Sequence, residues 1–218
     1  MMKIAIIGGT GPEGSGLSFR WAAAGHEVLI GSRRAEKGER VAAELLALRP
    51  DFKITGMDNV TAVLQADVAV LTVPYSAQVA TLESVKDELM GKLLITVVAP
   101  AGEKKARVYR LESGLSAAEE AQQQLGEAVR VVAAFQNIGA HHLLDLDYQM
   151  DCDVLVCGEK AADKAVAIQL AVEAGLRGVN AGSLANASVV EGLTSLLIFV
   201  NINQKVKDAG IRITGIGE

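Results

Sequence analysis

Residues 3–14 read KIAIIGGTGPEG, an apolar, β-branched run that leads directly into the motif G-x-G-x-x-G between Gly9 and Gly14. This motif binds a dinucleotide when a strand precedes it and a helix follows it, and the flanking residues predict both. Gly9 permits a tight turn, Gly11 lets the backbone approach a pyrophosphate, and Gly14 lets the helix pack close to the strand. The free N–H groups at the helix N-terminus then bind the anion. We therefore expect the dinucleotide to be contacted by Gly9, Thr10, Gly11, Pro12, Glu13 and Gly14.

The turn after the second expected strand reads Gly31-Ser32-Arg33-Arg34. An NAD site has an Asp or Glu there, which binds the ribose 2′-hydroxyl, whereas this chain has no carboxylate before Glu36. A serine hydroxyl and two guanidinium groups suit a 2′-phosphate, because arginine donates charge-assisted and often bidentate hydrogen bonds. The sequence therefore favours NADP, bound by Ser32, Arg33 and Arg34, with Thr10 and Lys37 as further contacts.

Apolar runs alternate with helical patterns along most of the chain. Strands are expected at residues 3–7, 27–30, 52–55, 67–73, 92–98 and 129–135. A loop at residues 8–15 opens a helix that continues to about residue 24, and further helices are expected at residues 35–48, 60–65, 77–88 and 116–126. A strand at 153–157, a helix at 160–174, an extended piece at 179–183 and a long apolar helical pattern at 184–207 follow. The alternation is typical of a parallel sheet covered by helices.

This pattern predicts an α/β fold, a Rossmann-type doubly wound, mainly parallel sheet with a small C-terminal helical lobe. We expect an NADP-binding Rossmann domain at residues 1–181. Residues 182–218 then form a helical lobe that closes the cleft or makes a dimer contact. Glu191, within the apolar helical pattern, is expected at an exposed position, and a buried functional carboxylate is the alternative.

Composition narrows the function classes. The chain has 218 residues, 50% of them hydrophobic, and a formal net charge of -5 with no long block of one sign, so nucleic acid is not expected as a partner. The most apolar late run, residues 196–200, is too short to span a bilayer, and we expect a cytoplasmic enzyme without a membrane partner. Cys152 and Cys157 lie five residues apart in an expected strand, on opposite faces, so we expect no disulfide and no metal.

Ligands of doubly wound sheets bind outside the carboxyl ends of the strands. Three strand ends should therefore border the nicotinamide ring of the cofactor. The residues expected there are Thr72, Val73 and Pro74 in the first loop, Val98, Ala99 and Pro100 in the second, and Gln136 and Asn137 in the third.

A dehydrogenase of alcohols or ketones also needs a positioned proton donor or acceptor. His141, His142 and Tyr75 are available, and no tyrosine lies in a Tyr-x-x-x-Lys pattern. Adjacent histidines on a loop are more often surface or capping residues, so we name no catalytic side chain and keep His141 as the alternative. This leaves room for hydride transfer between two stacked cofactors, for which the protein supplies orientation and a dry cleft.

Several stretches together resemble the NADPH-dependent reductases of the deazaflavin coenzyme F420. In the first half they are Gly8–Gly11, Gly25–Glu27, Gly31–Arg34 and Asp67–Pro74; in the second half they are Asp151–Gly158, Ala181–Asn186, Val190–Thr194 and Ala209–Gly215. The likeness spans nearly the whole chain. The glycine loop and the Ser-Arg-Arg turn are shared with related NADPH modules, including those of membrane ferric reductases, and the later stretches are more specific.

The resemblance implies reversible hydride transfer between NADP(H) and coenzyme F420 in a homodimer, with Thr10, Ser32, Arg33 and Lys37 holding the 2′-phosphate. The deazaflavin would lie by the loops after strands five and six and by the C-terminal helix. Members of the family carry His near the position of Gln136, and Gln136 keeps hydrogen-bonding capacity without a charge. Coenzyme F420 carries a phosphate and a glutamate tail, for which the chain offers Lys104, Lys105, Arg107 and Arg110.

Two alternatives stay open from the residues themselves. One is an NADPH-dependent reductase of a flavin or another small acceptor, which His141 or His142 beside the nicotinamide would favour. The other is a non-catalytic NADP-binding sensor, which would have no room for a second ring.

Overall fold

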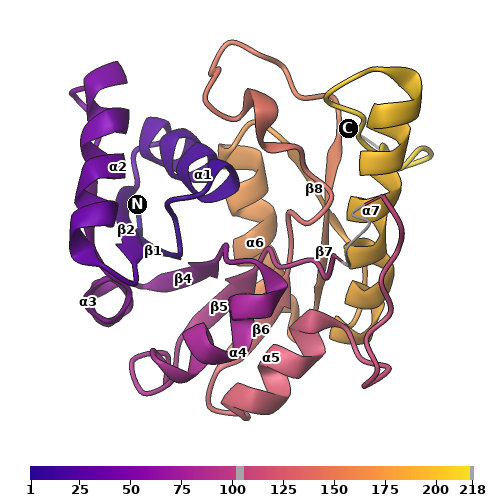
Figure 1. The fold of residues 1–218 in the computed structure, drawn as a ribbon, viewed down its shortest axis with the longest axis horizontal. Coiled ribbons are helices and arrows are strands. Elements are labelled where there is room, and N and C mark those ends of the chain that lie inside the picture. The colour runs from indigo at the N-terminus through magenta and orange to yellow at the C-terminus, as the bar shows by residue number, and fades with distance from the viewer. Residues whose placement is uncertain (102–105, 217–218) are drawn as a thin grey trace.

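The strand that opens the chain, β1 (Lys3–Ile7), lies inside the sheet with neighbours on both sides. A computed structural model describes residues 1–101 and 106–216. Across these residues the strand order is β3-β2-β1-β4-β5-β6-β7-β8 (Figure 1). The chain runs outward from β1 in one direction and from β4 in the other, so the switch point lies between these two strands. The predicted α/β class is confirmed.

The remaining elements have the following bounds. The strands are β2 (Glu27–Ser32), β3 (Ile54–Asp58), β4 (Val68–Leu71), β5 (Leu93–Thr96), β6 (Arg130–Ala133), β7 (Asp153–Gly158) and β8 (Arg177–Asn180). The helices are α1 (Pro12–Ala23), α2 (Ala35–Leu48), α3 (Asn59–Gln65), α4 (Tyr75–Glu83), α5 (Ala117–Leu125), α6 (Ala161–Glu173) and α7 (Ala187–Gln204), with short 3₁₀ turns η1 (Ala140–His142) and η2 (Leu184–Asn186).

Two apolar cores, one on each face, bury the sheet. One core joins α1, α2 and α6 through side chains such as Leu17, Val41 and Leu170. The other joins α3, α4, α5 and the start of α7 through side chains such as Val63 and Leu82. Both faces of the central strands are therefore covered, which explains why their sequences are continuously apolar rather than alternating.

The sheet is not parallel throughout, because β7 runs antiparallel to β6, and β8 then runs parallel to β7. The register pairs Val132 with Gly158 and Ala133 with Cys157. This reversal brings the first residues of β7 and β8, Asp153 and Arg177, toward the carboxyl end of β6. Residues from the last third of the chain thus reach the edge at which a doubly wound sheet binds its ligands.

Some predicted boundaries were wrong. The third strand covers residues 54–58 rather than 52–55, because Phe52 packs its ring on Phe19 (5.1 Å between centroids) and under the Arg49 guanidinium. The helix after β4 begins at Tyr75, directly after Pro74, and ends at Glu83, so it is displaced from the predicted 77–88. Residues 84–91 form turns instead.

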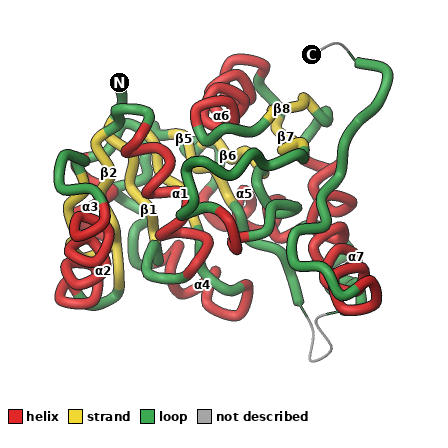
Figure 2. The backbone as a smooth tube through the Cα atoms, turned by 90° about the horizontal axis from the view of Figure 1, so that it is seen from above, coloured by secondary structure: helices red, strands yellow, loops and turns green. Residues whose placement is uncertain are grey.

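The C-terminal helix α7 lies at the end of the molecule opposite α2 and α3 (Figure 2). It packs against α5 and β7. The segment Leu184–Gln204 is long and apolar enough to cross a membrane by length and composition alone, and 28% of its apolar window is buried. The start of α7 shares an apolar core with α5. The division of the chain at residue 181 stays a prediction.

The two cysteines are free, with Cys157 buried in β7 and Cys152 partly buried just before it. Burial raises the pKa of both thiols to about 11, so both stay protonated at neutral pH. Inert thiols of this kind act as small packing residues.

Candidate active site

The glycine loop forms a tight turn between β1 and α1. The Gly9 amide donates to the carbonyls of Ile6 (3.1 Å) and Gly31 (3.0 Å), which ties the loop to β2. A Cβ on Gly14 would lie 2.7 Å from the Gly9 Cα, so a side chain at this position would push the helix away from the loop. A Cβ on Gly11 would meet nothing within 4 Å. The loop therefore leaves open space above Gly11, where a pyrophosphate could approach the backbone.

Asn59, which sequence reasoning missed, also holds the glycine loop. Its buried side chain accepts a hydrogen bond from the Gly8 amide (3.2 Å), and it lies at the start of α3, next to the Asp58 cap. Gly31 has no room for a side chain because its Cβ would lie 2.7 Å from the Asn59 Oδ1 atom. The only sequence signal was an Asp-Asn pair at a helix start, which predicts a cap rather than a contact 51 residues away.

Glu13 lies in the first turn of α1, between the two glycines that shape the loop. Its Oε1 atom is buried and has no hydrogen-bond partner among the described residues. Burial raises the pKa of this carboxyl to about 8, because water no longer stabilises the charged form. The carboxyl is therefore largely neutral at pH 7, although it lies at the helix end that would bind an anion.

The turn predicted to hold the 2′-phosphate closes β2 and opens α2. Ser32 is the last residue of β2 and is buried, and its Oγ accepts from the Arg34 amide (3.4 Å). Arg33, Arg34 and Lys37 are exposed, and their side chains make no ion pair within residues 1–101 and 106–216. One hydroxyl and three exposed cationic side chains thus lie close together in the sequence of this turn, and groups of this kind suit a phosphate monoester.

The loop after β4 packs on the glycine loop. Thr72 donates through both its amide (3.0 Å) and its Oγ1 (3.1 Å) to the carbonyl of Ile7, and Pro74 caps α4. The Val73 side chain leaves no space for a side chain at Gly8, where φ is +72°. These three predicted residues therefore lie beside the dinucleotide loop.

Tyr75, a candidate proton donor, is committed to another contact. Its hydroxyl donates to Glu120 (2.7 Å), which also accepts from Ser113 (2.6 Å). Burial and then the neighbouring carboxylate raise the pKa of Tyr75 to about 12. The phenol therefore keeps its proton near neutral pH and does not act as a base.

The loop after β5 leads to a cavity. Val98 is buried, and its amide donates to the Thr96 Oγ1 (3.3 Å). Pro100 lines a cavity of about 590 Å³ between residues 108–116 and the first half of α7. Of the predicted phosphate-tail cations, Arg110 lines this cavity, Arg107 is exposed, and Lys104 and Lys105 lie outside the described residues.

Glu191 lies in the wall of this cavity, and the prediction that it is exposed was wrong. The residue is 3% exposed, and its carboxylate accepts from the amides of Ala117 (2.9 Å) and Ala118 (3.0 Å) at the N-terminus of α5. Burial raises its pKa to about 7, although these two hydrogen bonds oppose the shift. The Glu191 carboxylate thus caps the N-terminus of α5, and this interaction stabilises an acidic side chain buried on the apolar helix α7.

Gln136 and Asn137 are both buried at the end of β6. The Gln136 Nε2 donates to the Thr96 carbonyl at the end of β5 (3.0 Å), while its Oε1 is buried without a partner among the described residues. Thr194 on α7 donates to the Gln136 carbonyl (2.6 Å). One unsatisfied amide oxygen thus lies near the strand ends where the nicotinamide was predicted, and such an orphan points to a missing partner.

The two histidines lie on a separate loop, on η1, which packs against α1. The His142 ring stacks on Tyr148 (3.8 Å) and its Nε2 lies 3.8 Å from Asp208. His141 is exposed and makes an edge contact with His142. The loop is held by buried Arg20, which donates to the carbonyls of His142, Leu143, Asp145, Tyr148 and Ala174.

Comparison with known proteins identifies the family. Residues 3–100 match the model of the family described as NADP oxidoreductase, coenzyme F420-dependent. The chain is 45% identical over 226 residues to the F420-dependent NADP reductase of Methanothermobacter thermautotrophicus, a match that covers 100% of this chain and 97% of that protein. It is 41% identical to the F420-dependent NADP reductase of Methanocaldococcus jannaschii, over 99% of both chains.

The chain belongs to the F420-dependent NADP reductase family. It is therefore an NADP-dependent oxidoreductase, and the resemblance expected from the sequence is confirmed. The fold agrees, since the crystal structure of a candidate F420-dependent NADP-reductase from Arthrobacter sp. FB24 superimposes with a TM-score of 0.81, at 23% identity, over 98% of this chain and 100% of that one.

In this reductase the predicted residues fall into two groups along one sheet edge. The glycine loop, the Ser32 turn and the loop after β4 cluster around the switch point between β1 and β4. Pro100, Gln136 and Asn137 lie farther along the edge, where α7 meets the ends of β5 and β6. The histidines lie on the loop that α1 supports, where His142 lines a small pocket together with Asn137.

Proposed function

We propose that this reductase transfers a hydride reversibly between NADP(H) and coenzyme F420 while both rings lie stacked at the carboxyl edge of the sheet. The nicotinamide and the deazaflavin supply the redox chemistry, and solvent supplies the proton that completes deazaflavin reduction. The protein orients the two rings and excludes water from the space between them.

The observation that carries this proposal is the shape of the acceptor side. The cavity of about 590 Å³ lies between Pro100 on the β5 loop and α7, the helix from which Thr194 also contacts Gln136. A pocket of this size suits a small-molecule ring, which argues against a sensor without room for a second ligand. Tyr75 is held by Glu120, and the histidines pack near Arg20, so no acid or base reaches this space from those residues.

The residues that would hold NADP(H) are those of the first group. The glycine loop and the α1 N-terminus would bind the pyrophosphate, and Thr10, Ser32, Arg33 and Lys37 would bind the 2′-phosphate, with Arg34 beside them. Thr72, Val73 and Pro74 would border the nicotinamide. Pro100, Gln136 and the cation Arg110 would face the deazaflavin and its anionic tail, with Val98, Ala99 and Asn137 supporting these loops.

The test follows the absorbance of oxidised coenzyme F420 when enzyme is mixed with NADPH or with NADH, with a flavin in a parallel cuvette. Rapid loss of the oxidised band with NADPH, and a much slower loss with NADH, is expected. NADPH consumption with the flavin but not with coenzyme F420 would keep the NADP site and overturn the choice of acceptor. Tight NADPH binding with no turnover of any acceptor would instead favour a sensor.

We also propose a homodimer in which α7 packs against a second copy of the chain. Beyond the cavity lining, the helix exposes Phe199 (51%) and Ile202 (68%), which are neighbours at i and i+3, and exposed apolar patches mark interfaces. Sedimentation analysis of Phe199→Glu is expected to shift the protein to monomer, whereas Val172→Glu on α6, equally exposed at 55%, should leave the assembly unchanged. A wild-type monomer would contradict the proposal.

The same helix is proposed to lie on the protein rather than in a membrane. Glu191 and Thr194 reach from it to α5 and to Gln136, and these polar contacts fix one face of the helix against the sheet. With a net charge of -5 and no long block of positive charge, the protein is proposed to work in the cytoplasm, free of nucleic acid.

A further inference from the structure

The backbone that presents Gln136 is strained. Phe135 is buried and has a φ of +72°, a left-handed conformation that is rare for a bulky residue. Its ring packs edge-on against Trp21, with 5.6 Å between centroids. A strained backbone conformation of this kind persists only where surrounding contacts stabilise it, and such conformations are common at ligand-binding sites. Something besides the local sequence must therefore hold residues 135–137.

Asn137 connects these residues to β7. Its Nδ2 donates to the Asp153 carbonyl (2.6 Å), and its Oδ1 accepts from the Leu155 amide (3.5 Å). Both polar atoms of the side chain are thus used on the first residues of β7. Because β7 runs antiparallel to β6, its first residues lie at the carboxyl end of β6.

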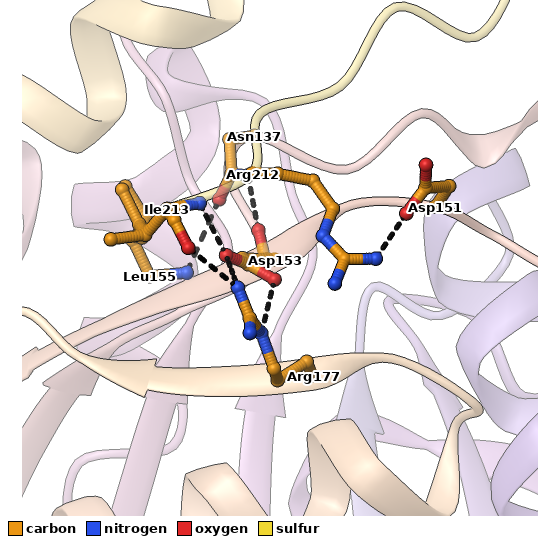
Figure 3. Close-up of polar contacts among 7 residues, drawn as sticks. All are labelled: Asn137, Asp151, Asp153, Leu155, Arg177, Arg212 and Ile213. Atoms are coloured by element: carbon orange, nitrogen blue, oxygen red, sulfur yellow. Dashed lines mark hydrogen bonds and ion pairs between the residues drawn. The ribbon is translucent and has the colours of Figure 1, made fainter. Parts of the chain in front are cut away.

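Asp153 in turn connects β7 to the C-terminal tail (Figure 3). Its side chain is fully buried and accepts from the Arg177 Nε and NH2 groups (2.8 Å each) and from the Ile213 amide (2.7 Å). Arg177 also donates to the Ile213 carbonyl, and the Asp153 amide donates to the Ile211 carbonyl. Hydrogen bonds from Arg177 lower the pKa of Asp153, so the carboxylate is charged at neutral pH.

We infer that Asp153, Arg177 and the backbone groups of Ile211 and Ile213 in the tail are positioning groups that hold Phe135 and Gln136 in the geometry required by the second substrate. We call these groups, together with Asn137, the Asp153 cluster. The inference rests on the proposed function, since it assigns the acceptor side of that site to the C-terminal tail. Among the described residues, no hydrogen bond or ion pair joins the glycine loop or the Ser32 turn to the cluster, so NADP(H) binding should be independent of it.

The geometry favours positioning over general stabilisation. A buried charge pair is weak evidence for stability, because the cost of removing both charges from water offsets their attraction. The pair instead fixes the orientation of the Asp153 carboxylate, because the planar Arg177 guanidinium donates two parallel hydrogen bonds to it. The cluster is bonded to the end of β6, which carries a residue with positive φ, Phe135, and a buried amide oxygen, Gln136 Oε1, that has no hydrogen-bond partner among the described residues.

The experiment uses the full-length enzyme and three variants. Asp153→Asn removes the charge from the cluster, and a chain ending at Gly210 removes the tail while keeping the Asp153–Arg177 pair. Arg212→Ala is the matched control, because Arg212 lies in the same tail but pairs with Asp151 at an exposed position. The truncated chain keeps the test valid if Asp153→Asn does not fold.

The first readout is hydrogen exchange of the peptide covering residues 134–139, with residues 3–14 as the internal reference. Both the Asp153→Asn and the truncated protein are expected to exchange at least about tenfold faster at 134–139, with no change at 3–14 and none in Arg212→Ala. Equal acceleration of both peptides, or no acceleration at 134–139, would overturn the inference.

The second readout separates the two substrates. In the same two variants the KM for coenzyme F420 is expected to rise about tenfold while the Kd for NADPH stays within about twofold. A parallel loss of NADPH affinity would overturn the assignment to the acceptor side. If the wild-type enzyme does not reduce coenzyme F420, the proposed function fails, and hydrogen exchange alone then decides whether the cluster holds Gln136.

Discussion

The two sides of the sheet edge are built in different ways. On the dinucleotide side, the turn is shaped mainly by backbone atoms and small residues of one βαβ unit, such as the Gly9 amide and the Gly31 carbonyl. Asn59 and Thr72 add contacts to this turn from α3 and from the loop after β4. On the acceptor side, side chains join elements far apart in sequence, as when Thr194 binds Gln136 across 58 residues and Ile213 binds Asp153 across 60. A site made of local backbone geometry leaves a motif, whereas a site made of long-range side-chain contacts leaves none.

The largest expected effect concerns Gly14. A Cβ there would lie 2.7 Å from the backbone of Gly9, so Gly14→Ala must displace α1 from the loop. We expect a loss of stability of about 1–3 kcal/mol from overpacking, together with a loss of NADPH affinity of roughly a hundredfold. Thermal unfolding and fluorescence titration with NADPH measure the two effects.

Gly11→Ala is the matched substitution, because a Cβ on Gly11 meets nothing within 4 Å. The melting temperature should stay at the wild-type value, while NADPH affinity falls because the methyl group occupies the space through which the pyrophosphate approaches. Unchanged NADPH affinity in Gly11→Ala would mean that the loop does not bind the pyrophosphate in the expected way.

The second effect concerns cofactor choice. Removing a hydrogen bond to a charged phosphate costs about 1.5–3 kcal/mol, so Arg33→Ala should lower kcat/KM for NADPH roughly 10- to 150-fold and leave kcat/KM for NADH nearly unchanged. Arg40→Ala, on an exposed part of α2 where Arg40 pairs with Glu44, is the control. An equal loss of kcat/KM with NADPH and with NADH would contradict the assignment of Arg33 to the 2′-phosphate.

The third effect is a dependence on pH. Because the pKa of Glu13 is raised to about 8 in the folded protein, from 4.5, folding has no ionisation cost below pH 4.5, and the cost grows up to pH 8. The α1 N-terminus favours the carboxylate and offsets part of it. Glu13→Gln should therefore stabilise the protein by about 1–2 kcal/mol at pH 8 and by almost nothing at pH 4.5.

Chemical denaturation at both pH values measures the change in unfolding free energy. Glu36→Gln, at an exposed position in the first turn of α2, controls for a simple change of net charge. If Glu13→Gln stabilises the protein equally at pH 4.5 and pH 8, an effect other than ionisation is responsible.

The sequence was sufficient for the part of the fold that follows local rules. The glycine loop, the bounds of β1 and α2, and the Ser32 turn were all read from patterns of a few residues. The exposed placement of Glu191 was wrong because an apolar helix pattern does not show that a carboxylate caps a different helix. Asn59 and Asp153 were missed for the same reason, since their partners lie 51 and 60 residues away.

The smallest expected effect tests whether the acceptor side needs an acid. His141 is exposed, and the His142 ring is stacked on Tyr148, although it lines a small pocket with Asn137 at the end of β6. We expect His141→Ala to change kcat by less than about twofold, because general acid–base catalysis would contribute at least about a hundredfold. His142→Ala should lower the melting temperature, since it removes the ring stack and the contact with Asp208, while kcat again stays near the wild-type value. A hundredfold loss of kcat in His141→Ala would mean that the loop moves onto the substrate during turnover, and the two sides of the site would then differ in chemistry as well as in construction.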